Sequence, residues 1–296
     1  MLDDAAYREL LAIRATRPGE VAERWQQRRR RPLLSPDGTL FLLAADHPAR
    51  GMLAAGARGT AMADRRDLLA RLMAGLAVPG VDGVLGTADV LEDLLLLGGL
   101  DGKVAFGSMN RGGLAGASFE LDDRITGYTA EAIADHGLDG GKLLLRVDPD
   151  DHGTLATLEC CAHAVACLAS RGLTVMIEPF AALRDGDGRL RHDLRAGPMA
   201  RVLAIAAGLG PSSAYTWLKV PVIPDMAGML AATTLPCVLL GGDPGDPGRP
   251  GAPWQDALAQ PQVRGVVVGR SVLYPQDDDV AGAARRLAGL LAETGG

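Results

Sequence analysis

One short run shows the unit from which this chain is built: Tyr215-Thr216-Trp217-Leu218-Lys219-Val220-Pro221. Its centre is apolar on both faces, which is typical of a strand buried in a parallel sheet. A single basic residue, Lys219, stands close to its end. The carboxyl ends of parallel strands are where a barrel gathers its catalytic groups. The run therefore predicts both a buried strand and a candidate reactive amine.

The same pattern occurs eight times: a short run rich in Val, Leu or Ile, a loop, and a stretch with helical periodicity. The predicted strands are Leu40–Ala45, Gly83–Gly86, Val104–Gly107, Leu143–Val147, Thr174–Glu178, Thr216–Val220, Cys237–Leu240 and Val266–Gly269. Helical stretches lie between them, for example Asp64–Ala77, Thr154–Ser170 and Pro198–Ala207. Eight such units over about 250 residues match an α/β fold of the (β/α)₈ TIM-barrel type. A doubly wound sheet is disfavoured, because its Gly-x-Gly-x-x-Gly turn is missing.

The segment before the first strand predicts a helical extension. Residues 3–31 predict one charged helix with a partial apolar face, and Pro32 and Pro36 end the segment. The run Arg28–Arg31 resembles a nucleic-acid-binding tract, but it is short and the chain has a net charge of −6, so a solvated helix end is the preferred interpretation. We therefore expect an N-terminal helical extension over residues 1–39 and a catalytic barrel over residues 40–296.

Composition excludes several classes of protein. The 296 residues are 48 % hydrophobic and 22 % charged, as in ordinary globular proteins, and the negative net charge argues against a nucleic-acid partner. No apolar stretch reaches the roughly 18 residues that suggest a membrane span. The start is acidic, unlike a signal peptide, and the four cysteines form no Cys-x-x-Cys pair, so reduced thiols are expected. These features predict a cytoplasmic protein that binds no membrane.

Lysine is rare enough here for each one to be informative. Of 30 basic residues only three are lysines: Lys103, Lys142 and Lys219. A partly desolvated amine can lose its proton and attack a carbonyl, which a guanidinium cannot do. Lys103 and Lys142 open apolar runs, whereas Lys219 closes one. Lys219 is therefore the candidate Schiff-base lysine, and the alternative is a strand-end lysine that reaches solvent.

Three further side chains at strand ends complete a candidate reacting set with Lys219: Asp46, Arg146 and Glu178. A neighbouring Arg146 would lower the pKa of the amine by like-charge repulsion. Glu178 and Asp46 could move protons or hold substrate hydroxyls. Each carboxylate alone could instead cap a helix or pair with Arg146, so the set rests on the four together.

The last two strands predict a phosphate site. Gly241 and Gly242 follow the seventh strand, and Gly269 and Arg270 follow the eighth, where barrels frequently bind phosphate. Glycines let an anion approach the backbone, and an arginine adds a bidentate contact, although a tight turn and a surface charge would look the same in sequence.

Two other strand-end residues, His47 and Asn110, are candidate substrate ligands. No His-x-His or His-Glu-x-x-His motif occurs, so no metal is expected.

At these residues the chain resembles the class I (Schiff-base) aldolases of the tagatose-bisphosphate and deoxyribose-phosphate aldolase-like barrel superfamily. It is also similar to an actinobacterial aldolase-like group linked to inositol breakdown. The resemblance covers roughly residues 40–275 and is carried by Leu42-Leu43-Ala44-Ala45-Asp46-His47, by residues 142–148 and 175–179, and by Leu218-Lys219-Val220-Pro221-Val222 with residues 240–242 and 267–270.

The resemblance implies that Lys219 forms the Schiff base, that Glu178 and Asp46 assist it, and that the glycines and Arg270 hold a phosphate. It implies a retro-aldol lyase that cleaves a phosphorylated ketose or keto-sugar acid and releases dihydroxyacetone phosphate. One substrate that fits is 5-dehydro-2-deoxygluconate 6-phosphate. No metal or organic cofactor is implied, and a homo-oligomer is expected. In one departure, related aldolases place a second lysine on strand four, where this chain has Arg146.

Two other functions remain open on the residues alone. A sugar-phosphate isomerase or epimerase would use the same phosphate site with a carboxylate base and Lys219 as an electrophile. A non-catalytic barrel would bind a sugar phosphate without turning it over.

Overall fold

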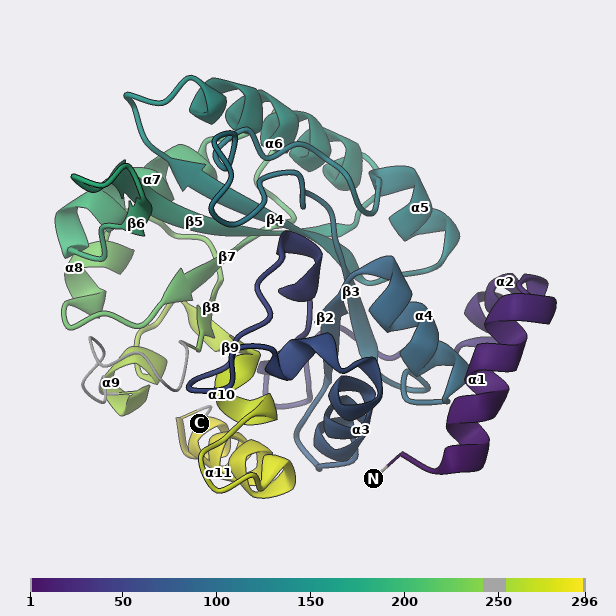
Figure 1. The fold of residues 1–296 in the computed structure, drawn as a ribbon. Coiled ribbons are helices and arrows are strands. Elements are labelled where there is room, and N and C mark those ends of the chain that lie inside the picture. Colours follow the sequence, from purple (N-terminus) through teal and green to yellow (C-terminus); the bar gives the residue numbers. More distant parts are fainter. Residues whose placement is uncertain (1, 242–253, 295–296) are drawn as a thin grey trace.

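A closed parallel β-barrel forms the centre of the molecule in the computed structural model, which describes residues 2–241 and 254–294 (Figure 1). Each strand of the barrel pairs with its neighbours in parallel, and β9 pairs with β1 to close the ring. The strands, in order around the barrel, are β1 (Leu40–Ala44), β2 (Gly83–Gly86), β3 (Val104–Ser108), β4 (Gly140–Val147), β5 (Thr174–Arg184), β7 (Thr216–Pro221), β8 (Cys237–Leu240) and β9 (Val263–Val268). The fold is therefore the (β/α)₈ TIM barrel that the repeating pattern predicts.

Helices surround the barrel between its strands (Figure 1). They are α3 (Arg65–Leu76), α4 (Ala88–Leu96), α5 (Ala130–Asp135), α6 (Gly153–Ala169), α7 (Ala196–Ala207), α8 (Met226–Leu230), α9 (Trp254–Leu258), α10 (Arg270–Leu273) and α11 (Val280–Thr294). Two short 3₁₀ helices, Pro48–Arg50 and Ala61–Ala63, lie between β1 and α3. The predicted helices at Asp64–Ala77, Thr154–Ser170 and Pro198–Ala207 correspond to α3, α6 and α7.

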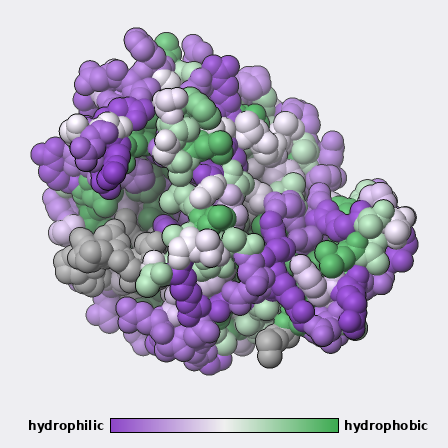
Figure 2. Space-filling view, viewed as in Figure 1, coloured by the Kyte–Doolittle hydropathy of each residue, from purple (hydrophilic) through white to green (hydrophobic). Residues whose placement is uncertain are grey.

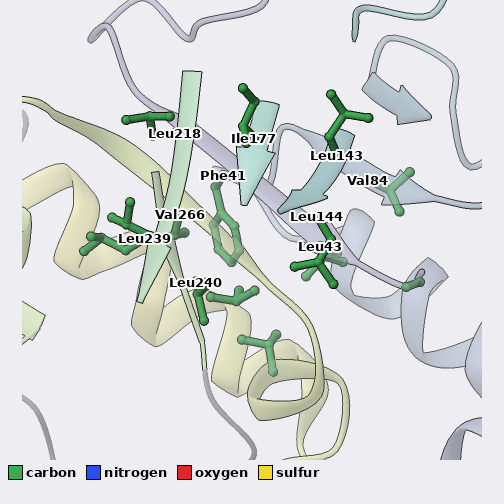
Figure 3. Close-up of a cluster of buried hydrophobic side chains, with 14 of the residues drawn as sticks. Phe41, Leu43, Val84, Leu143, Leu144, Ile177, Leu218, Leu239, Leu240 and Val266 are labelled. Atoms are coloured by element: carbon green, nitrogen blue, oxygen red, sulfur yellow. The ribbon is translucent and has the colours of Figure 1, made fainter. Parts of the chain in front are cut away.

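The strand residues divide between two cores. Side chains such as Leu42 and Phe106 point into the barrel and form a small inner cluster, whereas alternate residues such as Leu43 and Ile177 face the helices and join a larger outer cluster. Figure 3 shows part of the outer cluster. This alternation follows from the two-residue period of a strand. At the carboxyl end of each strand, every second side chain therefore points into the barrel mouth.

Several strands are longer than the apolar runs indicate, and the extensions of β4 and β5 affect the site. β4 begins at Gly140 rather than Leu143, so Lys142 lies inside the strand. β5 continues past Glu178 to Arg184, where it forms an antiparallel hairpin with β6 (Leu190–His192). This hairpin stands at the carboxyl end of the barrel and borders its mouth.

The N-terminal segment forms two helices rather than one. α1 (Asp4–Thr16) and α2 (Gly19–Gln27) are separated at Pro18, which has no N–H to continue the first helix. Both lie outside the barrel beside α4 (Figure 1), and Arg14 of α1 forms ion pairs with Glu92 and Asp93.

The four arginines that follow α2 are not helical, and each forms an ion pair, although the side chains of Arg29 and Arg30 remain exposed. Arg28 and Arg30 pair with Asp139, Arg29 pairs with Asp101, and Arg31 pairs with Asp82. Asp82 and Asp139 directly precede β2 and β4. The arginine run is therefore attached to the amino-terminal end of the barrel by fixed ion pairs.

Hydrophilic side chains cover most of the face shown in Figure 2. Within the described ranges, no helix is both long enough and apolar enough to cross a membrane. The four cysteines are free thiols: Cys161 and Cys237 are buried, and Cys160 and Cys167 are half-buried.

Candidate active site

A cavity of about 530 Å³ opens at the carboxyl ends of the barrel strands. Residues from β4 to β9 and from the segments that follow β1, β3, β8 and β9 line it. This is the end of a barrel at which catalytic side chains meet. Asp46, Glu178 and Lys219, which the sequence analysis selects, all line this cavity.

Two buried lysines meet at one carboxylate in its floor. The Lys219 Nζ lies 2.9 Å from Oε1 of Glu178, and Lys142 forms an ion pair with Oε2 of the same side chain. Lys142 also lies 3.3 Å from Oδ2 of Asp46. The result is a continuous chain of alternating charges, Lys219–Glu178–Lys142–Asp46, whose four side chains are buried at the base of the cavity.

Strand register explains this arrangement. Ile177 pairs with Leu218 and Leu144 pairs with Glu178, so Glu178 and Lys219 lie at the same level of the barrel. On β4, Lys142 lies one inward position below Leu144, and Arg146 lies one position above it. The strand-four cation that contacts Glu178 is therefore Lys142 and not Arg146.

Arg146, also on β4, instead contacts the loop between β3 and α5. Its Nη1 lies 2.5 Å from Oε1 of Glu120, and its Nη2 donates to the backbone oxygens of Glu120 and Gly113. The contacts described for Arg146 do not include Lys219, so Arg146 is not the cation beside this amine. Arg146 still lines the cavity, nearer its mouth.

Two residues that the sequence analysis passed over surround Asp46. Ser108 donates its hydroxyl to Oδ2 of Asp46 at 3.0 Å, and the Arg111 Nη1 lies 3.1 Å from the same oxygen. Ser108 ends β3 on its inward face, so strand period was the signal that could have identified it. Arg111 lies in the following loop, whose path no periodicity predicts.

The buried charges shift one another's pKa values. Burial lowers the pKa of Lys142 to about 8, and the positive charges of Arg111 and Lys219 add to this, against the opposing pull of Asp46 and Glu178. Burial alone would raise the pKa of Asp46, but Arg111 and Lys142 hold it well below its usual range. Burial would likewise raise the pKa of Glu178, and the two lysines hold it far below its usual range. Both carboxylates are thus ionised, and Lys142 is poised near neutral pH.

His47 also lines the cavity, next to Asp46 and to Gly269 after β9. Burial lowers the pKa of His47 to about 3, which outweighs the attraction of Asp46, so its imidazole is neutral. A Cβ on Gly269 would lie 2.9 Å from Cε1 of His47 and 2.6 Å from the backbone oxygen of Ala44, so only glycine fits there. In the described part of the chain, no three His, Cys, Asp or Glu side chains are grouped as metal ligands would be.

The structure locates three of the four residues that are predicted to bind phosphate. Gly241, Gly269 and Arg270 line the cavity, after the seventh and eighth strands of the barrel. Gly242 lies outside the described residues. Asn110 is occupied elsewhere: its side chain donates to the backbone oxygens of Asp123 and Leu144 and accepts from the Leu144 N–H. Asn110 thus fastens a loop to β4 rather than facing the cavity.

Several solved structures have a fold similar to that of this chain. The crystal structure of Cgl0159 from Corynebacterium glutamicum is 49 % identical, with a TM-score of 0.95, and the match covers 99 % of both chains. An archaeal fructose 1,6-bisphosphate aldolase is 18 % identical, with a TM-score of 0.60, over 92 % of this chain and 99 % of the other. A fructose-bisphosphate aldolase from Slackia heliotrinireducens is 16 % identical, with a TM-score of 0.63, over 86 % of this chain and 81 % of the other.

The fold thus resembles that of class I aldolases at low sequence identity. None of the curated proteins matches the sequence. The family model described as Cgl0159-like matches residues 38–288, which span the whole barrel and every residue of the site described above. The chain belongs to the Cgl0159-like family.

Proposed function

We propose that this protein is a class I aldolase, a carbon–carbon lyase that cleaves a phosphorylated ketose or keto-sugar acid through a Schiff base on Lys219. The observation that carries the proposal is the buried contact of Lys219 and Lys142 with one carboxylate, Glu178, in the barrel mouth. A nucleophilic amine needs a desolvated site and a route by which its proton can leave. Glu178 and Lys142 offer such a route.

In the proposed reaction the neutral Nζ of Lys219 adds to the ketone carbon, and the carbinolamine loses water to give an iminium. The neighbouring carbon–carbon bond then breaks. Its electron pair moves to the iminium and forms an enamine, and the hydroxyl proton of the departing aldehyde half passes to a base. Protonation of the enamine carbon and addition of water regenerate Lys219 and release the ketone, which we propose is dihydroxyacetone phosphate.

The pKa shifts favour Lys142 as that base. Asp46 and Glu178, the candidates expected from the sequence, have lowered pKa values and are therefore weak bases. Lys142, with a pKa lowered to about 8, is partly neutral at physiological pH. We assign Glu178 and Asp46 to holding the two amines and guiding protons between them.

The substrate's phosphate is proposed to bind at Gly241, Gly269 and Arg270, with His47 beside it. The resemblance in sequence suggests 5-dehydro-2-deoxygluconate 6-phosphate as one substrate. A Schiff-base-forming fructose-1,6-bisphosphate aldolase shares the fold at 18 % identity, which makes the reaction class worth testing, but the paired amines carry the proposal. We further propose a cytoplasmic homo-oligomer that needs no metal or organic cofactor.

The test is reduction with borohydride in the presence of dihydroxyacetone phosphate, followed by peptide mass spectrometry. Since the chain has only three lysines, each can be mapped without ambiguity. We expect a stable adduct on Lys219, none in Lys219→Arg, and normal trapping in the control Lys103→Arg, which changes a lysine at the other end of the barrel. An untrapped wild-type protein, beside a control aldolase that is trapped, would contradict this mechanism with this ketone.

A further inference from the structure

The β5–β6 hairpin has a second hollow behind it, outside the catalytic cavity. This rear pocket has a volume of about 290 Å³ and lies between the hairpin, the end of β4 and α7. Apart from Asp193 and Arg201, the described residues that line it are apolar or glycine. They include Val147, Ala181, Leu183, Pro198 and Val202. The proposed reaction uses none of these residues.

The rear pocket offers apolar surface that water now covers. Leu183 at its rim is 40 % exposed, whereas Val202 is buried. An apolar group that displaces water from such a surface gains free energy. A water molecule takes up about 30 Å³ in the liquid, so the pocket has room for about ten atoms of that size. This is the size of a small organic molecule with a short aliphatic chain.

The charge of the rear pocket is positive, because its one acid is already paired. Asp193 accepts from Arg195, whose Nε lies 2.9 Å from Oδ1. Arg201 on α7 is exposed, and its guanidinium forms neither a hydrogen bond nor an ion pair within the described ranges. An apolar wall with one available guanidinium at its edge matches the two ends of an aliphatic carboxylate.

The hairpin separates the rear pocket from the catalytic cavity. Phe180 and His192 line the catalytic cavity, and their rings stack with their centroids 4.1 Å apart. Ala181 and Leu183 of the same strand line the rear pocket, and the backbone oxygen of Ala181 accepts the N–H of Asp193. α7 packs against β5 (Figure 1). A ligand in the rear pocket would therefore contact α7 and the hairpin together, and would restrain a wall of the catalytic cavity.

We propose that the rear pocket binds a small aliphatic carboxylate that is distinct from the substrate, and that its binding orders the β5–β6 hairpin beside the catalytic cavity. The chain of the ligand lies on the apolar wall, and its carboxylate pairs with Arg201. This inference does not rest on the proposed function, since the lysines of the catalytic cavity take no part in it.

Three probes separate the contribution of the chain from that of the charge: hexanoate, butyrate and the neutral hexanamide. Calorimetric titration of the full chain at fixed ionic strength should give about tenfold tighter binding for hexanoate than for butyrate, which has two methylene groups fewer. Hexanoate should also bind at least about threefold tighter than hexanamide, which has the same shape without the charge. Equal affinities for the three probes, or no binding of hexanoate, overturn the proposal.

Variants locate the binding, because the catalytic cavity is also rich in basic side chains. Arg201→Gln should remove the preference for hexanoate over hexanamide, and Leu183→Asp, which adds a like charge at the exposed rim, should weaken hexanoate binding at least about tenfold. The control Arg189→Gln changes another exposed arginine, in the turn of the hairpin, that does not line the pocket, and should keep the preference. Binding that is unchanged in both pocket variants, or a preference that is lost in the control, would overturn the assignment to the rear pocket.

Hydrogen exchange of the backbone amides tests the ordering of the hairpin. With hexanoate bound, amides within residues 181–184 and 190–193 should exchange at least about threefold more slowly, and this slowing should be absent in Arg201→Gln at the same hexanoate concentration. Binding without slower exchange in these segments would contradict the ordering. Borohydride trapping on Lys219 is measured without hexanoate, so failure of the aldolase mechanism and failure of this site are distinguishable.

Discussion

Glu178 connects the two amines of the site, and its surroundings decide what each residue can do. A carboxylate between two lysines is stabilised as the anion, so its proton affinity is low. The Lys142 amine, by contrast, is buried and lies near the positive charges of Arg111 and Lys219, which lower its pKa and favour loss of its proton. We therefore assign the proposed role of proton acceptor to Lys142 rather than to the acids.

This assignment predicts a specific pH dependence. The pKa of Lys142 is lowered from 10.5 to about 8, and a base must be neutral to accept a proton, so kcat should rise with pH up to about 8 and then level off. Lys142→Gln should lower kcat by about 10²- to 10⁴-fold and remove this rise. The measurement is kcat against pH with whichever ketose phosphate is turned over.

Lys103→Gln is the matched control, because Lys103 donates to the backbone oxygen of Val81 at the opposite end of the barrel. A profile that keeps its alkaline rise in Lys142→Gln would assign the titration to another group.

The position of Lys142 also explains why the sequence analysis selected Arg146 as the strand-four cation of the reacting set. Both residues occupy inward positions of the same strand, and a two-residue period cannot say how deep in the barrel each one lies. Depth is set by the register of β4 against β5, which depends on contacts between distant segments. Lys219 and Glu178 were found because each stands near the end of an apolar run.

At the scale of elements, close approach of neighbouring strands fixes that register. A Cβ on Gly83 of β2 would lie 1.8 Å from the backbone oxygen of Val104 on β3. A Cβ on Gly140 of β4 would likewise lie 2.4 Å from the backbone oxygen of Thr174 on β5. No side chain can be accommodated there without moving a strand.

Gly83→Ala should therefore lower the free energy of unfolding by about 3 kcal/mol, since the clash is with backbone and the neighbouring strand must shift. Gly289→Ala on α11 is the control: nothing lies within 4 Å of the added Cβ, and alanine should add about 0.5 to 1 kcal/mol in a helix. Urea unfolding of both variants measures the difference. Similar stability of the two would mean that the strands do not approach as closely as described.

The positions of helices and strands could be predicted from the sequence where a hydrophobic pattern marks them, but not elsewhere. All eight barrel strands lie where the apolar runs predict, because strands buried on both faces leave continuous runs. The β5–β6 hairpin was missed because Phe180, Ala181 and Ala182 follow Pro179, which reads as a strand end. The break between α1 and α2 was missed because the charged pattern continues across Pro18.

At the scale of the whole molecule, the two ends of the barrel have separate tasks. The carboxyl end carries the cavity, and the amino end carries the ion pairs that attach the N-terminal segment. Asp82 and Asp139 each join three parts of the chain: they accept the N–H groups of Phe41 and Ala105 on neighbouring strands, and they pair with the arginine run. The charged residues at this end therefore serve stability rather than catalysis.

The ion pairs of the arginine run allow a test of whether the amino end of the barrel serves stability. Arg28 is buried, it donates to the backbone oxygens of Lys103 and Gly137, and its counter-charge is Asp139 at 3.3 Å. Asp139→Asn keeps the shape of the side chain but leaves the Arg28 guanidinium buried without that charge, so the free energy of unfolding should fall by about 3 to 5 kcal/mol. Trypsin should then cleave after Arg28 to Arg31 faster than in the wild-type protein, as the segment separates from the barrel more often.

The control is Asp101→Asn, which removes the exposed partner of Arg29. Water already solvates that pair, so its loss should change neither the urea midpoint nor the cleavage rate measurably. Borohydride trapping on Lys219 should be unaffected in both variants while they remain folded, because the cavity lies at the opposite end of the barrel. Equal effects of the two substitutions on cleavage would show that burial of Arg28 does not hold the N-terminal segment in place, and the docking would then have to come from the apolar contacts of α1 and α2 with the barrel's helices.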